Sequence, residues 1–406
     1  MLEADLITLI QKIQHNQCDF QTIEVIAANT NTPRLYETLS SFSNQDNGGI
    51  IVLGLNETDN YKVCGVFNLE KLKHDIVCAC QQMEPSLSPL FTETTIDEKF
   101  ILCVEIPGID VYSRPVFYKG SGRSYVRVDG KNEPMCDYEI YSYKAFKHRI
   151  RDDLRPVNNA NLSLFDKDLL NKFLNQVKKD KTILQNNFSD DEILELFGIT
   201  VNSVPTLSGV LTFSKYPQAY YPQLSIVAAV IPGTRIGELG PNNERFISSK
   251  RFTGNIIQQL ESALCFLSRN MKDRIVIGRT GDKEYTTEYP LKTLKEAILN
   301  ALVHRDYSTL TENTPIVINL FTDRLEIINK GDLYGNLTVE TLGKVQAATR
   351  NPALTNMQAF LELSEPRYLG IPTICEEMKN ANLTVPIFVN HQGEFKVILN
   401  NGCKSC

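Results

Sequence analysis

The sequence lacks any segment that is long and apolar enough to cross a membrane. It contains no run of 18 apolar residues, and its longest apolar stretch, at residues 224–231, has the length of a buried strand. The first 13 residues combine acidic side chains with an amphipathic helical period, whereas an export signal needs a basic start followed by a continuous apolar run. We therefore expect a cytoplasmic protein with no membrane partner.

Three further absences exclude whole classes of protein. No GxxxxGK[ST] motif occurs, which excludes a P-loop nucleotide site. The ten cysteines lack the dense, regular spacing of a secreted disulfide scaffold, so we interpret most of them as reduced thiols. The net charge of -6 excludes a uniformly basic surface, although it leaves room for a local basic patch that binds nucleic acid.

The composition that is present indicates a folded, multi-domain chain. Hydrophobic residues make up 42% and charged residues 22%, which is close to globular averages, and a length of 406 residues predicts two or three domains. Helical periods alternate with strand-like runs, so we predict a mixed α/β (α+β) architecture. We place an α/β domain at residues 1–140, a linker with a helical and mixed middle region at 141–285, and a last domain at 286–406.

The first candidate site lies in a predicted helix that reads EAILNALVHRDY, residues 296–307. Glu296 and Asn300 are four residues apart and therefore share one face of the helix. An amide oxygen can complete the coordination shell of Mg²⁺, and a carboxylate beside it can orient a water molecule or take its proton. A solvated polar stripe would show the same spacing, so the pair alone leaves both interpretations open.

A predicted hairpin follows this helix. The segment PIVINLFTDRLEIINKG alternates apolar and polar residues around a turn at Thr322 and Asp323. It ends in Asn329-Lys330-Gly331-Asp332, where Gly331 allows close approach of the backbone to a ligand. We expect this turn to lie beside the helix.

Four segments occur in the order of a known family: KEAILNALVHRDY, DRLEIINKGDL, ATRNPAL and LGIPTICEEM. Over residues 290–400 the chain resembles the bacterial and archaeal transcriptional regulators that join a Schlafen/AlbA-like domain to a divergent Bergerat (GHKL-type) ATPase domain. The resemblance implies a Bergerat-like α/β sandwich at the C-terminal end that binds ATP with Mg²⁺.

The resemblance also implies roles for individual residues. Asn300 would be the amide that ligates Mg²⁺, and Glu296 would be the catalytic acid that orients water. Asn329 and Gly331 would form the turn on the adenine side, and Gly370 would belong to the loop on the phosphate side.

Two positions depart from the family pattern. Asn329 stands where the wider fold has an Asp that binds the adenine amine, and an amide oxygen can accept the same hydrogen bond. The phosphate-side loop reads Tyr368-Leu369-Gly370-Ile371 where the family has G-T-G-I. Since bulky side chains hinder the approach of backbone N–H groups to phosphate, we predict at most weak ATPase activity.

The motif HRDY at residues 304–307 contains three polar side chains that could touch a ligand. We predict instead that His304, Arg305 and Asp306 orient the end of the helix through hydrogen bonds.

Residues 5–135 resemble the Schlafen/AlbA-like domain itself, through FSNQDNGGIIVLGLNE, KVCGV, FILCVEIPG and RPVFYKGSGRSYVRVDG. That family is associated with nucleic-acid binding, and some members cut RNA with clustered acids and a lysine. Asp19 and Glu24 match two of the acids, but Ile26 stands in place of the lysine. A metal-dependent nuclease needs such a cluster, so we do not expect nuclease activity.

A basic hairpin is the candidate nucleic-acid site. Lys119, Arg123 and Arg127 alternate with aromatic residues, so that Tyr125 could stack on a base while the cations contact phosphates. A solvated strand face with buried tyrosines would show the same spacing, and the family resemblance favours binding.

These observations predict a transcriptional regulator that binds DNA or RNA through its N-terminal domain and ATP with Mg²⁺ through a degenerate C-terminal site. A catalytically inactive interaction scaffold or defence-type protein is the alternative, and a Schlafen-like metal-dependent RNase is the third. A homo-oligomer is compatible with each.

Overall fold

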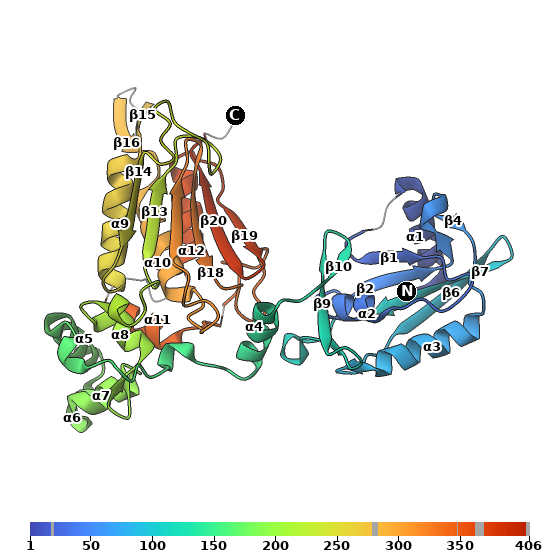
Figure 1. Cartoon of the computed structure of the whole chain (residues 1–406), viewed down its shortest axis with the longest axis horizontal. Helices are drawn as coiled ribbons and strands as arrows, with labels where there is room; N and C mark the ends of the chain where they lie inside the picture. Colours follow the sequence, from blue (N-terminus) through green and yellow to red (C-terminus); the bar gives the residue numbers. More distant parts are fainter. Residues whose placement is uncertain (18–19, 278–282, 347, 362–368, 403–406) are drawn as a thin grey trace. The chain divides into compact units, whose positions relative to one another are not determined.

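The computed structural model describes residues 1–17, 20–277, 283–346, 348–361 and 369–402. The chain divides into two compact units, Met1–Arg149 and Ile150–Cys406. Both mix helices with sheets, which confirms the predicted α/β multi-domain architecture (Figure 1). The first unit ends later than the predicted boundary at residue 140, because residues Asp137–Lys147 form a helix, α4, that packs within this unit.

The N-terminal unit contains two sheets, ordered β1-β2-β7-β6 and β10-β9-β8-β5, and a short pair β3-β4. Its remaining helices and its strands are α1 (Glu3–Asn16), β1 (Ile23–Ile26), α2 (Tyr36–Ser43), β2 (Gly49–Leu53), β3 (Leu55–Asn56), β4 (Lys62–Val63), α3 (Leu69–Gln81), β5 (Met83–Glu84), β6 (Leu90–Ile96), β7 (Lys99–Ile106), β8 (Phe117–Tyr118), β9 (Arg123–Val128) and β10 (Lys131–Pro134).

Alternation along the central strands divides the core of this unit into two layers. On β2, Ile51 and Leu53 face the cluster that contains α2 and α3, whereas Val52 faces the cluster that contains α1. Helix α1 contributes Leu6 and Ile10 to the second layer, where both are fully buried. The first sheet is therefore covered by helices on both faces, as its nearly continuous apolar strands require.

Helix α2 joins the first sheet to the second through an unusually polar buried surface. Asn44, at the end of α2, accepts a hydrogen bond from the backbone N–H of Val116 at 2.9 Å. Its amide also donates to the carbonyl oxygen of Tyr125 at 2.9 Å and lies 3.0 Å from the hydroxyl of Ser124. Asn44 is thus a hydrogen-bonded bridge between α2 and the strands β8 and β9.

The C-terminal unit is built on a six-stranded sheet with the order β14-β13-β17-β18-β20-β19. Its elements are α5 (Lys167–Asp180), α6 (Thr182–Asn187), α7 (Asp190–Leu196), β11 (Thr200–Val201), β12 (Val204–Pro205), α8 (Leu207–Phe213), β13 (Ile226–Val230), β14 (Ser248–Phe252), α9 (Ile256–Asn270), β15 (Asp273–Ile277), β16 (Lys283–Thr287), α10 (Leu291–His304), β17 (Ile316–Leu320), β18 (Arg324–Lys330), α11 (Pro352–Phe360), α12 (Gly370–Asn380), β19 (Ile387–His391) and β20 (Glu394–Asn400).

The predicted middle region (141–285) and last domain (286–406) contribute strands to one sheet. Strand β13, from the middle region, pairs in parallel with β17 over all five of its residues, from Ile226 opposite Ile316 to Val230 opposite Leu320. Helix α9 packs against both β13 and α10. One hydrophobic core therefore spans both predicted regions, because the sheet is completed only by strands from each of them.

Three helices, α9, α10 and α12, form a layer on one face of this sheet, and α10 lies between the other two (Figure 1). Because α10 is covered on several sides, it is apolar around most of its circumference: the consecutive residues Ala297, Ile298 and Leu299, which point in different directions, are all buried. The predicted hairpin of residues 315–331 is confirmed as β17 and β18. This arrangement is the expected α/β sandwich.

Helices α5 to α8 and α11 gather at one end of the sheet (Figure 1). Phe173 lies at the centre of their contacts, with its ring edge-on to Phe197, Phe213 and Phe360. Among the described helices of the whole chain, none is long and apolar enough to cross a membrane.

The bridge formed by Asn44 yields a stability prediction. Asn44→Ala leaves the buried N–H of Val116 without its acceptor, so we expect the free energy of unfolding of the N-terminal unit to fall by about 2 kcal/mol. Urea unfolding followed by circular dichroism measures this change. Asn31→Ala, at an exposed asparagine of the same unit, should change it by less than about 0.5 kcal/mol. Equal effects of the two substitutions would show that the bridge does not hold the sheets together.

Candidate functional site

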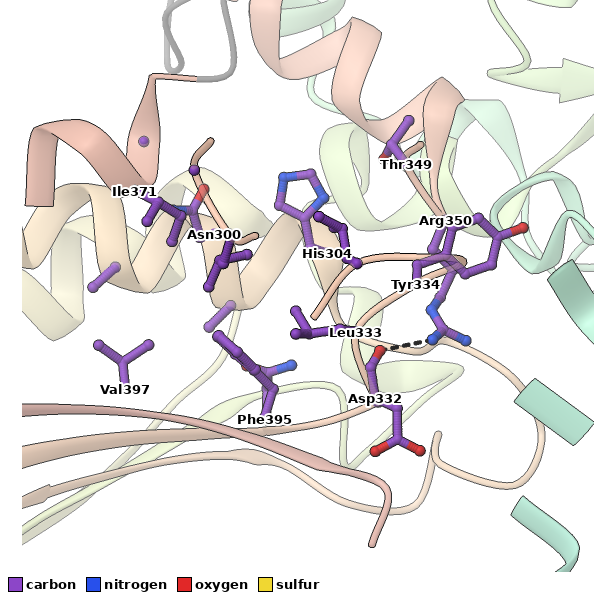
Figure 2. Close-up of a pocket in the computed structure, with 18 of the residues that line it drawn as sticks. Asn300, His304, Asp332, Leu333, Tyr334, Thr349, Arg350, Ile371, Phe395 and Val397 are labelled. Atoms are coloured by element: carbon purple, nitrogen blue, oxygen red, sulfur yellow. Dashed lines mark hydrogen bonds between the residues drawn. The ribbon is translucent and has the colours of Figure 1, made fainter. Parts of the chain in front are cut away.

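A pocket opens between α10, α12 and the inner face of the sheet, with a volume of about 1070 Å³ that includes its open mouth. Helix α10 supplies one wall, β18 and β20 the floor, α12 a second wall, and the segment of residues 331–350 the remainder (Figure 2). It is lined by Ala297, Asn300, Ala301, His304, Asn329, Gly331, Asp332, Leu333, Tyr334, Leu337, Leu342, Gly343, Val345, Ala348, Thr349, Arg350, Gly370, Ile371, Ile374, Phe395 and Val397.

Residues that the sequence singled out converge on this pocket from three separate segments. Asn300 comes from α10, Asn329 and Gly331 from the end of β18, and Gly370 from the first turn of α12. Glu296 is half-buried one helical turn before Asn300 and is not a lining residue. The walls are mostly apolar and carry few polar groups, which is typical of small-molecule sites.

Gly370 is the closest point between α12 and the polar pair on α10. A Cβ atom at this position would lie 2.8 Å from the amide nitrogen of Asn300 and 3.3 Å from a carboxylate oxygen of Glu296. Only glycine leaves this space free, so the absence of a side chain keeps a small gap lined by an amide and a carboxylate. Leu369, beside it, is 42% exposed and is not a lining residue. Tyr368 lies outside the described residues.

The turn after β18 is held tightly against the end of α10. Gly331 has φ +122°, and a Cβ there would lie 2.8 Å from the backbone nitrogen of Asp306. That nitrogen donates to the carbonyl oxygen of Lys330 at 2.9 Å, and the N–H of Gly331 donates to the carbonyl of Gly393 at 2.8 Å. Gly331 is therefore required for the approach of two protein segments, in addition to lining the pocket.

A buried ion pair fixes this corner of the pocket. Nη1 of Arg350 lies 2.7 Å from Oδ2 of Asp306, and the two side chains are 6% and 0% exposed. Nη2 of Arg350 donates to the carbonyl oxygen of Asp332 at 2.9 Å, shown as the dashed line in Figure 2. The guanidinium also lies over the ring of Tyr334, 4.9 Å from its centre. Arg350 thus joins both ends of the segment 331–350 to Asp306, just after the end of α10.

The residues of the motif HRDY lie in two different surroundings. As predicted, Arg305 and Asp306 organise the end of α10: Arg305 is buried and donates to the carbonyl oxygen of Thr314 at 2.8 Å, and Asp306 accepts the bond from Arg350. Asn351 completes this region by donating to the carbonyl oxygens of Val303 and Arg305. His304, for which the same role was predicted, lines the pocket one turn after Asn300 (Figure 2).

His304 borders the pocket, and its side chain is exposed. Loss of hydration lowers the pKa of its imidazole below the ordinary value. The exposure of the side chain limits this shift, and the direction of the shift favours the neutral ring, which can both donate and accept a hydrogen bond.

The sequence did not identify most of the apolar walls. Leu333, Tyr334, Leu342 and Val345 lie in a segment without regular secondary structure, where no periodicity marks an inward-facing residue. Phe395 was detectable in principle, because it pairs with Asn329 across adjacent strands and so shares its face of the sheet.

The basic hairpin of the N-terminal unit divides into two halves. Lys119 and Arg123 are exposed, whereas Tyr125 and Arg127 are buried. Nη1 of Arg127 lies 2.7 Å from Oε2 of Glu24, and its guanidinium lies 5.0 Å from the ring centre of Phe42. Tyr125 and Arg127, which were predicted to contact nucleic acid, are therefore enclosed within the unit, where helix α2 packs against β9.

Both carboxylate oxygens of Glu24 accept hydrogen bonds from neighbouring side chains. Besides Arg127, it accepts hydrogen bonds from the hydroxyl of Thr38 at 3.0 Å and from the amide of Asn132 at 3.2 Å. Asp19 lies outside the described residues. Across the described part of the chain, no group of three or more His, Cys, Asp or Glu side chains could hold a metal ion.

Two protein families match the chain. The family described as "Schlafen, AlbA_2" matches residues 19–136, and the family described as "Putative ATP-dependent DNA helicase recG C-terminal", of the HATPase type, matches residues 313–399. The chain carries a Schlafen AlbA_2 domain and a RecG-type HATPase domain. The second match includes Asn329, Gly331 and Gly370 but begins after α10, so Glu296 and Asn300 join the site through the fold alone.

Two solved structures are similar to the chain. The DIP2311 protein of Corynebacterium diphtheriae is 17% identical, with 98% of this chain and 80% of that chain covered and a TM-score of 0.48. The N-terminal domain of a "Putative ATP-dependent DNA Helicase RecG-related Protein" from Nitrosomonas europaea is 23% identical, with coverages of 32% and 91% and a TM-score of 0.26. No curated protein matches the chain.

The ion pair in the HATPase domain predicts a large effect of one substitution. Arg350→Ala leaves the carboxylate of Asp306 buried without its cation, so we expect the free energy of unfolding to fall by about 3–5 kcal/mol. Lys292→Ala removes a more exposed ion pair with Glu377 in the same domain and should cost at most about 1 kcal/mol. Urea unfolding of both variants tests this, and similar losses would contradict the role given to Arg350.

Proposed function

We propose that the protein is a regulator that binds Mg·ATP in the pocket of its HATPase domain and nucleic acid through its Schlafen AlbA_2 domain. One observation carries the proposal: Asn300, Asn329, Gly331 and Gly370, predicted from separate segments, line the same pocket. The alternative for Glu296 and Asn300 is a polar stripe that faces solvent. A solvated stripe would not lie against a glycine of a second helix, as this pair lies against Gly370.

The floor of the pocket suits a purine ring. Asn329 is almost buried between apolar neighbours, and its amide nitrogen lies 3.4 Å from the carbonyl oxygen of Lys330. This contact directs the amide oxygen away from the backbone, where it can accept a hydrogen bond from an exocyclic amine. Phe395, Val397 and Ile374 supply flat apolar surface for the ring.

The opposite end suits the metal-bound phosphates. The amide of Asn300 and the carboxylate of Glu296 face the gap that Gly370 leaves open, and both are oxygen donors of the kind that Mg²⁺ accepts. The first turn of α12 begins at this point, so the backbone N–H groups of Gly370 and Ile371 can approach phosphate oxygens, whereas Pro372 has no N–H. A bound Mg²⁺ would neutralise phosphate charge, and Asn300 would hold it while Glu296 orients water.

The charge of the pocket favours binding that depends on Mg²⁺. Arg350 is the one lysine or arginine among the described lining residues, and Asp306 already neutralises it. Those residues therefore offer a triphosphate little positive charge. We propose that turnover is at most weak, because the loop before Gly370 departs from the glycine-rich family pattern.

For the Schlafen AlbA_2 domain we propose a reduced contact set, with Lys119 and Arg123 as phosphate ligands. Both are exposed and lie at the turn that joins β8 to β9. Regulation of transcription, and any assembly of several copies of the chain, belong to the same proposal. Ile26 and the neutralised Glu24 support binding over RNA cleavage.

The nucleotide proposal is tested by the gap at Gly370. Saturating Mg·ATP, at about 100 times its dissociation constant, should stabilise the HATPase domain by roughly 2.7 kcal/mol, measured by thermal melting. Gly370→Ala displaces the amide of Asn300 and should remove this gain while the melting of the free protein changes little. Gly402→Ala is the matched control, since no atom lies within 4 Å of its added Cβ. No stabilisation of the unmodified protein by Mg·ATP would overturn the proposal.

The nucleic-acid proposal is tested by salt dependence. Lys119→Ala with Arg123→Ala should lower affinity for a labelled oligonucleotide and reduce the slope of log K against log[salt] by about 2, one for each lost phosphate contact. Lys62→Ala with Lys71→Ala removes the same charge from exposed positions elsewhere in the domain and should leave the slope unchanged. Fluorescence anisotropy measures both, and equal slopes for all three proteins would refute the assignment.

A further inference from the structure

The segment that connects the two units is anchored at the walls of the nucleotide pocket. It begins at the unit boundary, between Arg149 and Ile150, and its next residues are bound within the HATPase domain. Two side chains in this connection, Asp153 and Arg155, make contacts that reach both pocket motifs, HRDY and RNP.

Asp153 anchors the connection to the RNP motif, residues 350–352. It is 1% exposed, and its Oδ2 accepts a hydrogen bond from the backbone N–H of Ala353 in the first turn of α11, at 2.8 Å. Arg151 neutralises the same carboxylate through two bonds, of 2.8 and 3.0 Å. Ala353 follows Arg350 by three residues, so Asp153 binds the chain immediately after a pocket wall.

Arg155 anchors the connection to the HRDY motif. Its Nη2 lies 2.5 Å from a carboxylate oxygen of Glu312 and 3.4 Å from the carbonyl oxygen of Tyr307. Tyr307 follows the pocket residue His304 by three positions. The connection therefore touches both segments that Arg350 and Asp306 clamp together, and each of these segments also contributes a pocket wall.

We propose that nucleotide binding in the HATPase pocket is transmitted to the connection between the two units through these two anchors. The inference rests on the proposed nucleotide function and adds its regulatory consequence. A ligand that orders the pocket walls also orders the segments that hold Asp153 and Arg155. The connection then loses less conformational entropy when it stays bound to these segments. By linkage, the state of the connection changes nucleotide affinity by the same factor.

Trypsin cleavage within the connection reports whether the connection is bound to the HATPase domain. Arg149 and Arg151 are sites for trypsin, and cleavage after Arg151 requires the docked residues around it to open. The full-length protein is digested with and without Mg²⁺ and a non-hydrolysable ATP analogue, while thermal melting of the same samples reports binding. Cleavage after Lys62, in the other unit, is the internal reference for protease activity.

We expect the analogue to slow cleavage after Arg151 by about fivefold or more, the lower end of typical coupling, with the reference site unchanged. Asp153→Asn keeps an acceptor for Ala353 but loses the charge pair with Arg151, so it should retain the melting shift and lose most of the protection. Lys178→Ala removes a more distant ion pair, with Asp190, and should behave as the unmodified protein.

The outcomes separate the two proposals. A melting shift without protection after Arg151 overturns the coupling and leaves nucleotide binding intact, whereas the absence of a melting shift overturns both. If Asp153→Asn does not fold, Arg151→Lys keeps the cleavage site but replaces the two-bond pair with a single contact. Full protection in that variant would likewise overturn the coupling.

Discussion

The HATPase domain depends on one buried ion pair between residues 44 positions apart, Asp306 and Arg350. A buried charge is tolerated only when its partner and its hydrogen bonds are complete, so the geometry around this pair has little freedom. Asp306 follows the end of the helix that carries Asn300, and Arg350 binds the carbonyl of Asp332 just after the strand that carries Asn329. The pair therefore sets the separation between the two sides of the pocket that carry Asn300 and Asn329.

Local patterns in the sequence were sufficient to predict the elements but not how they assemble. The spacing of Glu296 and Asn300 predicted a shared helix face, and the alternation before Asn329 predicted its hairpin, because both depend on periods of two or four residues. No period relates Asp306 to Arg350, or assigns the strand at Ile226–Val230 to the sheet of a later segment. Such pairings follow from tertiary packing, which a single sequence does not display.

The N-terminal unit shows the same limit at the level of one strand. Alternation placed Arg123, Tyr125 and Arg127 on one face of β9, but it could not show that α2 covers part of that face. Arg127 is consequently a buried partner of Glu24, while Arg123, near the turn, remains exposed. From the sequence alone, Glu24 and Arg127 could form a buried ion pair, or they could belong to a nucleic-acid site. Only their burial distinguishes these two interpretations.

The contacts of the connection limit how strongly a nucleotide could act on it under the proposed coupling. A ligand can shift a conformational equilibrium only by the difference between its affinities for the two states. The two anchors hold the connection through groups that do not line the pocket. Under the proposed coupling, a bound nucleotide would therefore act on them only by ordering the segments that follow His304 and Arg350. Weak turnover would suit this arrangement, because a site that hydrolyses ATP slowly keeps its ligand, and thus its effect on the connection, for longer.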